Sequence, residues 1–412
     1  MMKTINSYKF RIYPDKEQEE QLFKTIGSAR KVYNLLLEEY EGLYSRYKNG
    51  EITKDVHHKD RKSLNHAVFR NSEEYGYLKE VDSTALKYAH KHVNRAYSNF
   101  FNGVSDKPVF KKKNVHKWSY TTCRASKTSR NLRLEKGGNL TLPKVPGRVR
   151  TVVSKNPRGT LVSATITKTR SDKWFVSLQY ESHDKVVVRP DTVELLSSPV
   201  GVDMGIKELA ITSDGVTYGN NKVGYLFKKR IARLDKKLSR QREQAKKDGR
   251  KLSECRNYQK TRIARAKAYE KVSNIRKDTL HKITTDLVNN HDFIGIENLS
   301  SKNLLKNHNL AFAISDASWN EFITFLSYKA HSRGTVVQKI DRFYASTQIC
   351  SGCLSQTGPK GLGSLGIREW ACSDCGIVHD RDVNAAVNIL RESLRVCFAV
   401  GTTGNQALKI SG

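Results

Sequence analysis

The sequence predicts a multidomain α/β protein. Its 412 residues exceed the length of one ordinary domain. Segments with the period-two pattern of strands alternate with segments in which apolar residues recur every three or four positions, as they do in helices. Two Cys-x2-Cys pairs near the C-terminus predict a small metal-binding unit within the larger fold.

The N-terminal part predicts one strand followed by helices. Tyr8, Phe10 and Ile12 alternate with basic residues, so they form a half-buried strand that ends at Pro14-Asp15. A helix with one apolar face follows, and Asp82 can cap a later helix. The apolar faces of the two helices are expected to consist of Leu22, Ile26, Ala29, Tyr33 and Leu36, and of Leu86, Ala89, Val93, Ala96 and Phe100.

The middle of the chain, from Lys107-Pro108 onward, predicts β-structure. Residues 160–170 and 173–181 flank a short turn and form a hairpin within a small sheet or barrel. Tyr13 and Trp118 could stack on nucleobases, but aromatic residues beside strands more often belong to the core, and we interpret them as core residues. A linker over residues 185–198 leads into the next part.

The C-terminal half predicts short apolar strands and long helices. Two of the strands, Pro199–Asp203 and Phe293–Glu297, end in an acidic residue. The other expected elements are a hairpin over 209–218, basic helices over 226–290 with a turn at Gly249, a helix over 316–332, a strand over 336–340 and a helix from about Asp382.

The chain is strongly basic. It carries 73 Lys and Arg against 41 Asp and Glu, a formal net charge of +32, which indicates a polyanionic partner. Residues 228–251 hold twelve basic residues against three acids, although a solvated helix face stays the alternative. Candidate phosphate contacts are Lys111, Lys112, Lys113, Lys228, Lys229, Arg230, Arg233, Lys236, Lys237 and Arg240. No apolar run approaches the length of a membrane span, and the N-terminus lacks the apolar region of a secretory signal.

The cysteine pattern predicts one structural Zn²⁺. Cys350-x2-Cys353 and Cys372-x2-Cys375 are separated by eighteen residues, the spacing of a zinc ribbon. Because four thiolates complete a tetrahedron, no position is left for catalysis. The remaining cysteines are expected to be unligated in a reduced, cytoplasmic chain: Cys123, Cys255 and Cys397.

Three separated acids predict a second metal site. Asp203 and Glu297 end apolar strands, and Asp382 lies at the start of a helix. Carboxylates at the ends of adjacent strands and at a helix N-terminus can converge, and Mg²⁺ prefers such hard oxygen ligands. Two Mg²⁺ ions there would stabilise the attacking and leaving oxygens of a phosphodiester displacement. Each acid alone is weak evidence, since strand-end acids are often solvated.

The motifs VGVDMG, IGIENLS and DRDVNAAVNIL, with the cysteine pairs before the last, resemble the three RuvC motifs of the TnpB proteins, which are compact transposon-encoded relatives of type V CRISPR effector nucleases. YKFRIYPDKEQEEQL and KPVFKKK are also similar to that family. The resemblance implies that Asp203, Glu297 and Asp382 are the catalytic, Mg²⁺-binding acids. Asp380 is the competing choice, but the family's acid precedes x-Asn-Ala, which selects Asp382.

The resemblance also implies the domain organisation, with an RNase H-like RuvC nuclease domain, an inserted zinc ribbon, an oligonucleotide-binding-type wedge barrel and a helical recognition insert. In relatives, the insert and wedge recognise a short motif flanking the target, which makes Ser83, Thr84, Lys87 and His90 candidates, although an ordinary exposed helix stays the alternative. The expected ranges are wedge 1–13 and 104–188, recognition domain 14–103, RuvC domain 189–345 and 379–398, zinc ribbon 346–378 and tail 399–412.

The resemblance therefore implies an RNA-guided, Mg²⁺-dependent DNA endonuclease, with a guide RNA and double-stranded target DNA as partners. Composition indicates only a polyanionic partner, and the acids indicate only metal-assisted phosphodiester chemistry. Two alternatives stay open: a RuvC-like nuclease that uses no guide, and a nucleic-acid-binding regulator without catalysis.

Overall fold

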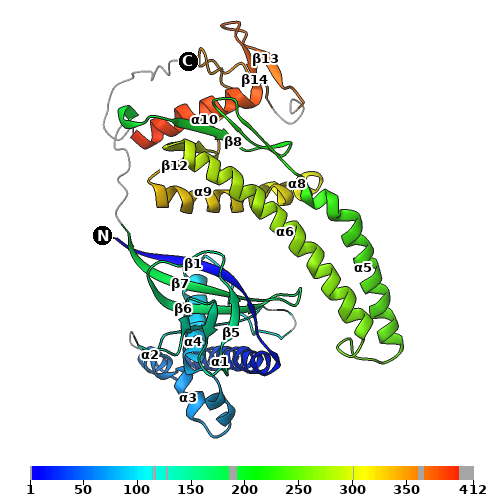
Figure 1. The fold of residues 1–412 in the computed structure, drawn as a ribbon. Helices are drawn as coiled ribbons and strands as arrows, with labels where there is room; N and C mark the ends of the chain where they lie inside the picture. Colours follow the sequence, from blue (N-terminus) through cyan, green and yellow to red (C-terminus); the bar gives the residue numbers. More distant parts are fainter. Residues whose placement is uncertain are drawn as a thin grey trace. The chain divides into compact units, whose positions relative to one another are not determined.

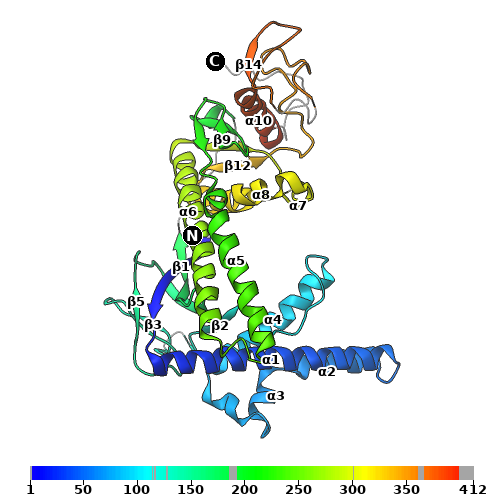
Figure 2. The same ribbon diagram turned by 90° about the vertical axis from the view of Figure 1, so that its right-hand side faces the viewer.

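The computed structural model describes residues 2–113, 115, 117–126, 129–184, 193–299, 301–360 and 366–398. The chain divides into two compact units, Met1–Val186 and Val187–Gly412, and each is described by itself (Figures 1 and 2). The predicted linker up to residue 192 and the tail over 399–412 lie outside the described residues. Within the described part, no helix combines the length and the apolar character that crossing a membrane requires.

Unit 1 combines a curled antiparallel sheet with helices. Its seven strands follow the order β2-β6-β7-β1-β5-β4-β3, so the N-terminal strand β1 lies in the middle of the sheet. The elements are β1 (Met2–Tyr13), α1 (Lys16–Lys48), α2 (Lys54–Ser63), α3 (His66–Asn71), the 3₁₀ helix η1 (Gly76–Glu80), α4 (Ser83–Phe101), β2 (Trp118–Cys123), β3 (Arg133–Leu134), β4 (Asn139–Thr141), β5 (Val149–Val152), β6 (Thr160–Lys168) and β7 (Trp174–Asp184).

The predicted first strand, the two capped helices and the hairpin of unit 1 are confirmed. Lys168 pairs with Trp174 across the turn between β6 and β7. Asp15 forms a capping box with Gln18 at the start of α1, and Asp82 caps α4. One hydrophobic core joins the buried faces of α1 and α4 to the inner face of the sheet.

Two predictions about aromatic residues in unit 1 are wrong. Phe100 is exposed, and the buried face of α4 continues from Val93 to Tyr97, because a spacing of four places Tyr97 against Tyr40 of α1. Tyr13 is 49% exposed at the end of β1. The guanidinium groups of Arg11 and Arg150 lie 5.0 and 5.6 Å from its ring, so cation–π contacts replace core packing there.

Unit 2 is built on a five-stranded sheet of order β10-β9-β8-β11-β12, in which β8, β11 and β12 run parallel. Its elements are the 3₁₀ helix η2 (Val193–Leu195), β8 (Pro199–Asp203), β9 (Glu208–Thr212), β10 (Thr217–Gly219), α5 (Val223–Lys247), α6 (Arg256–Asn290), β11 (Phe293–Ile296), α7 (Ser301–Leu304), α8 (His308–Ala317), α9 (Trp319–Arg333), β12 (Val336–Lys339), β13 (Glu369–Ala371), β14 (Val378–Asp380) and α10 (Arg381–Phe398).

The strands and long helices of unit 2 agree with the expected pattern, with one exception. The helix expected over 316–332 is interrupted, and α8 and α9 meet at Ser318. Ser318 has φ +54°, and a residue in the left-handed region cannot continue a right-handed helix. The expected turn at Gly249 is confirmed, since Gly249 has φ +64° between α5 and α6, which lie side by side in both views (Figures 1 and 2).

Two glycines allow α10 to lie directly on β8 and β11. A Cβ added at Gly201 would overlap the carbonyl oxygen of Ala386 and lie 2.7 Å from the backbone nitrogen of Leu390. A Cβ added at Gly295 would lie 2.8 Å from Cβ of Ser393. The neighbouring residues of both strands point to the opposite face, where they pack with α6 and α9. The sheet is therefore covered on both faces, and α10 lies at backbone contact distance from the two acid-bearing strands.

We expect Gly201→Ala to displace α10 and lower cleavage strongly. The added methyl group meets backbone atoms of α10 that cannot rotate away, so overpacking should cost about 1–3 kcal/mol and lower the Tm of unit 2 by roughly 2–4 °C per kcal/mol. Thermal melting and cleavage assays measure both effects. Gly366→Ala is the matched control, because no atom of the described residues beyond its chain neighbours lies within 4 Å of its added Cβ. Equal behaviour of the two variants would contradict this account of α10.

Candidate functional site

Asp203 and Glu297 lie side by side at the carboxyl ends of two neighbouring strands of the unit 2 sheet. Strands β8 and β11 are parallel, with Val202 beside Ile296, so each acid immediately follows a paired position. Because side chains alternate along a strand, both acids lie on the face of Gly201 and Gly295, which is the face that α10 covers. The period of two thus directs both carboxylates toward the helix that carries the third acid.

The structure distinguishes Asp382 from Asp380 by their different contacts. Oδ1 of Asp380 accepts hydrogen bonds from the backbone nitrogens of Asp382 and Val383, at 3.0 and 2.9 Å. Asp380 is therefore the N-cap of α10, and its side chain is exposed. Asp382 lies in the first turn, close enough to Asp203 for its charge to raise the pKa of that carboxyl.

Without a bound cation, the site disfavours the simultaneous ionisation of its three carboxyl groups. Burial raises the pKa of Asp203 well above its ordinary value, and the charges of Glu297 and Asp382 raise it further. Arg381 has the opposite, smaller effect on this pKa. Burial also raises the pKa of Glu297, although Ser346 stabilises its carboxylate by donating a hydrogen bond of 3.0 Å to Oε1. A cation between the carboxylates would remove this repulsion.

Arg368 contacts the third acid. Its Nη1 atom lies 2.7 Å from Oδ2 of Asp382, in an ion pair that is partly exposed. The three carboxylates do not form a group with all ligand atoms within 4.8 Å, and in the described part of the chain only the four cysteines do. The acids therefore share one edge and one face, and the carboxylate of Asp382 is turned toward an arginine.

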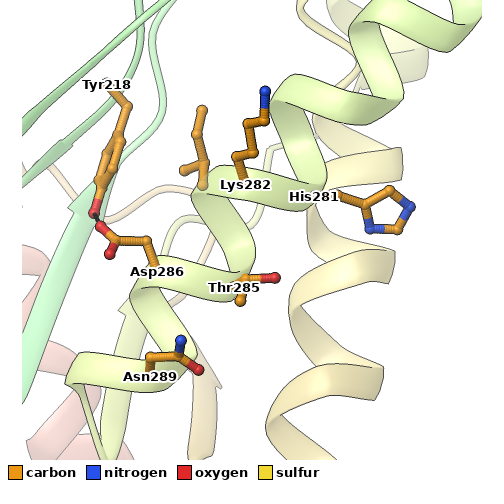
Figure 3. Close-up of a pocket in the computed structure, with 7 residues that line it drawn as sticks. Tyr218, His281, Lys282, Thr285, Asp286 and Asn289 are labelled. Carbon is orange, nitrogen blue, oxygen red and sulfur yellow. Dashed lines mark hydrogen bonds between the residues drawn. The ribbon is translucent and has the colours of Figure 1, made fainter.

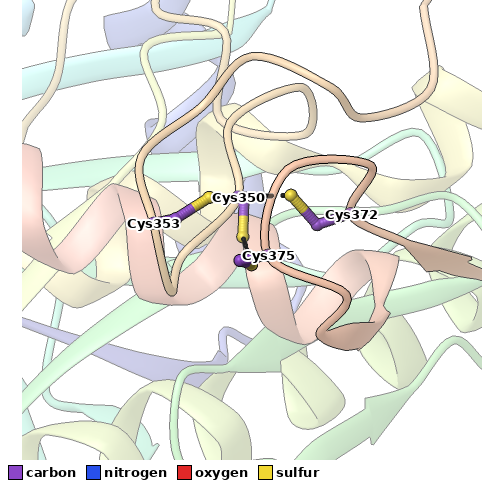
Figure 4. Close-up of side chains that lie close together, drawn as sticks. All are labelled: Cys350, Cys353, Cys372 and Cys375. Carbon is purple, nitrogen blue, oxygen red and sulfur yellow. Dashed lines mark hydrogen bonds between the residues drawn. The ribbon is translucent and has the colours of Figure 1, made fainter.

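Four cysteine sulfurs converge in the segment between β12 and α10 (Figure 4). The Sγ atoms of Cys350 and Cys375 lie 3.6 Å apart, as do those of Cys353 and Cys372. Metal–sulfur bonds of about 2.3 Å at tetrahedral angles place sulfurs roughly 3.8 Å apart, so the spacing fits one tetrahedral ion. His379 Nε2 lies 3.0 Å from Sγ of Cys350, where it can donate a hydrogen bond to the thiolate. Cys123, Cys255 and Cys397 lie outside this group.

Two asparagines of α10 form hydrogen bonds with the backbone of the cysteine-rich segment and so connect it to the helix that carries Asp382. Asn384 accepts from the backbone nitrogen of Ser351 and donates to the carbonyl oxygen of Ile349, both at 2.8 Å. Asn388, one turn later, donates to the carbonyl oxygens of Ser346 and Ile349. Our sequence analysis missed Ser346, Arg368 and both asparagines as site residues. The i, i+4 spacing of the asparagines in DRDVNAAVNIL was the available signal.

The predicted nucleic-acid contacts fall into several groups. The seven predicted contacts on α5 are all exposed, as backbone contacts would require. Thr84 and His90 instead belong to internal hydrogen-bond networks, because Thr84 Oγ1 donates to Asp82 and His90 Nε2 lies 3.2 Å from Tyr40 Oη. Ser83 and Lys87 are exposed on α4, and Lys112 and Lys113 are exposed before β2. Lys111 is partly buried.

A broad hollow of about 620 Å³ lies along α6, away from the acids (Figure 3). Tyr218 of β10 donates a hydrogen bond of 2.6 Å to Oδ2 of Asp286, and burial together with this acid raises the pKa of the phenol. His281 also lines the hollow, and its imidazole stacks on Phe325, with ring centroids 4.0 Å apart. The lining contains none of the three strand-end and helix acids.

Three family models match parts of the chain. Residues 177–308 match a family described as "Probable transposase", and residues 319–389 match the Cas12f1-like TNB domain. Residues 1–49 match a model described as a helix-turn-helix domain, although this segment forms the strand β1 and the single helix α1 here.

Curated relatives cover nearly the whole chain. A protein of Streptomyces pristinaespiralis named "Putative RNA-guided DNA endonuclease" is 34% identical over 96% of this chain and 90% of its own length. Its Escherichia coli namesake InsQ is 28% identical over 94% of this chain and 92% of its own length. A solved complex of Cas12f1 with sgRNA and target DNA is 11% identical, with a TM-score of 0.59 over 94% of this chain and 98% of the other, which indicates a shared fold.

Proposed function

The chain belongs to the TnpB family of RNA-guided DNA endonucleases, and from this premise we propose that Asp203, Glu297 and Asp382 form its metal-dependent nuclease centre. The observation that carries the proposal is that the three acids lie at the same end and on the same face of the sheet. Two follow paired positions of parallel strands, and the third lies on the helix that covers the same face. Burial and the charges of Glu297 and Asp382 raise the pKa of Asp203, and a divalent cation between the carboxylates would relieve this repulsion.

Asp203, Glu297 and Asp382 would hold Mg²⁺, for which their carboxylate oxygens are suitable hard ligands. When bound, two such ions stabilise negative charge on the attacking and leaving oxygens of a phosphodiester. The hydrogen bond from Ser346 orients Glu297 and favours its ionised form, against the effect of burial. Arg368 is placed to neutralise Asp382 before metal binds, and its guanidinium can then contact a phosphate of the substrate.

The cysteine cluster is proposed to hold one Zn²⁺, since the sulfur spacing fits four thiolate ligands. It joins the ribbon strands β13 and β14, and β14 leads directly into α10. Arg368 lies just before β13, and its carbonyl oxygen accepts a hydrogen bond of 2.7 Å from the nitrogen of Arg381. Zinc would therefore fix the geometry of both Arg368 and Asp382.

The basic surface is proposed to bind a guide RNA and the target DNA strand that pairs with it. Exposed cations of α5, such as Lys229, Arg233 and Arg240, suit backbone phosphates, whereas base pairing would supply sequence selection. We further propose that α4 and the sheet of unit 1 recognise a short motif flanking the target. Ser83 and Lys87 are the exposed candidates for that role.

We expect purified protein to carry RNA whose guide segment determines where DNA is cut. The bound RNA is sequenced and its guide segment is replaced. Mg²⁺-dependent cleavage is then measured on plasmids that match either the old or the new guide. In each plasmid, the matching site lies next to a randomised flanking sequence. Cleavage should follow the new guide and should require a short flanking motif. Cleavage that is insensitive to removal of RNA would instead indicate a nuclease that uses no guide.

A further inference from the structure

Unit 1 contains a cavity of about 270 Å³ between α1, α4, β2 and the segment that precedes β2. We call it the basic pocket. Among its described lining residues none is acidic. Its polar lining consists mainly of cations and hydroxyl groups, including Arg30, His92, Lys111, Lys117 and Ser119.

Lys111 is held firmly at the wall of the basic pocket. The side chain of Asn34 donates to the carbonyl oxygen of Lys111 at 3.1 Å and accepts from its backbone nitrogen at 2.8 Å. The Nζ atom lies 3.6 Å from the ring centroid of Tyr33. Burial lowers the pKa of this ammonium group to about 8. A lysine whose backbone and side chain are both fixed is preorganised for a ligand.

The cations of the basic pocket are not ion-paired with any acid among the residues that the structure describes. Within the described part of the chain, no ion pair involves Arg30, Lys111 or Lys117. Burial lowers the pKa of Arg30, and desolvation together with Lys111 and Arg95 lowers that of His92. Gathering partly desolvated cations without an anion is unfavourable for the fold, so the arrangement indicates an anionic ligand.

We propose that the basic pocket binds one backbone phosphate of a polynucleotide, with Arg30 and Lys111 as its principal contacts. The guanidinium of Arg30 can donate two parallel hydrogen bonds to phosphate oxygens, and Lys111 adds a compact charge. The hydroxyl of Ser119 and the imidazole of His92 are further donors. The cavity is smaller than a typical small-molecule site, which suits a single phosphate with part of its sugar. The inference rests on the proposed function, since it takes guide RNA or target DNA as the source of the phosphate.

The test compares the full-length double variant Arg30→Gln/Lys111→Gln with Lys79→Gln/Lys136→Gln, whose exposed lysines lie in the same unit and whose net charge is equal. Filter binding measures affinity for the sequenced guide RNA. A second assay, in an Asp203→Asn background that leaves DNA uncut, measures capture of a matching duplex by the RNA-loaded protein. We expect one of the two affinities to fall about 10- to 100-fold in the pocket variant, with a salt slope smaller by about one.

Loss of RNA affinity identifies the guide as the source of the phosphate, and loss confined to duplex capture identifies the target. Equal affinities of pocket and control variants in both assays would overturn the inference and leave the proposed function intact. Wild-type protein that binds no RNA would overturn both. Arg30→Lys/Lys111→Arg keeps both charges and should restore most of the affinity. If the double variant has a much lower Tm than the wild type, the single variant Lys111→Gln replaces it, with an expected loss of affinity of about 10-fold.

Discussion

Replacing Asp203 by Asn should abolish target cleavage and, in the metal-free protein, raise the Tm of unit 2. Cleavage should fall by at least about 10³-fold, because a ligand of the proposed metal site is lost. The Tm should rise because the neutral amide no longer repels Glu297 and Asp382. We expect a gain of about 1–2 kcal/mol, or roughly 2–8 °C, measured by scanning calorimetry in buffer without Mg²⁺ and without a chelator that would remove zinc.

The gain from Asp203→Asn should depend on pH in a definite direction. In the wild type, the raised pKa of Asp203 means that the folded protein binds its proton more tightly than the unfolded chain does. The free energy of unfolding therefore falls as pH rises from the ordinary aspartate pKa of 3.8 through the raised pKa. The stability difference between Asp203→Asn and the wild type should accordingly be small near pH 4 and grow as pH rises. Mg²⁺ should reduce that difference at neutral pH, since it binds the wild-type carboxylates.

Asp380→Asn is the matched control for the acid site. Asparagine is as good an N-cap as aspartate, so α10 should keep its start and cleavage should be retained. Asp382→Asn, two residues away, should abolish cleavage. The reverse pattern would show that Asp380 is the third acid. The same variants test the alternative of a regulator without catalysis. If the wild type cuts DNA, and Asp203→Asn binds RNA and captures the target without cutting, that alternative is excluded.

Replacing Cys350 and Cys353 together by Ser should release one zinc per chain and slow cleavage by about 10- to 100-fold. Loss of two thiolates opens the tetrahedron, and the binding free energy of the metal no longer supports the ribbon. The ribbon carries Arg368 and leads into Asp382, so its loosening should misplace both side chains. Elemental analysis measures the zinc, and cleavage of a matched plasmid measures the rate.

Cys255→Ser is the control for the ribbon, because Cys255 lies between α5 and α6, outside the sulfur cluster. It should keep both zinc and activity. Unchanged zinc content in Cys350→Ser/Cys353→Ser would contradict the ligand set. Full zinc loss with normal cleavage would show that the ribbon does not position Asp382.

The comparison between sequence and structure is clearest at α10. DRDVNAAVNIL predicts a helix that begins near two aspartates, but local pattern leaves both as candidates for a metal ligand. Their contacts distinguish the two. Asp380 accepts hydrogen bonds from backbone nitrogens and caps the helix, whereas Asp382 forms an ion pair with Arg368. Similarly, VGVD and IGIE predict strands that end in acids, whereas the close approach of Ala386 and Ser393 explains why glycine precedes each acid by two positions.

The amino-acid sequence by itself determined the elements with strong periodicity, the cysteine quartet and the pair of strand-ending acids, because these depend on residues close together in the chain. Tertiary structure alone decided the break at Ser318, the burial of Tyr97 in place of Phe100, the partners of Glu297 and Asp382, and the basic pocket. Those features join residues from separate elements, such as Lys111 with Asn34 and Ser346 with Glu297. Local propensity carries no information on which distant side chains packing will bring together, and this is the physical reason for the difference.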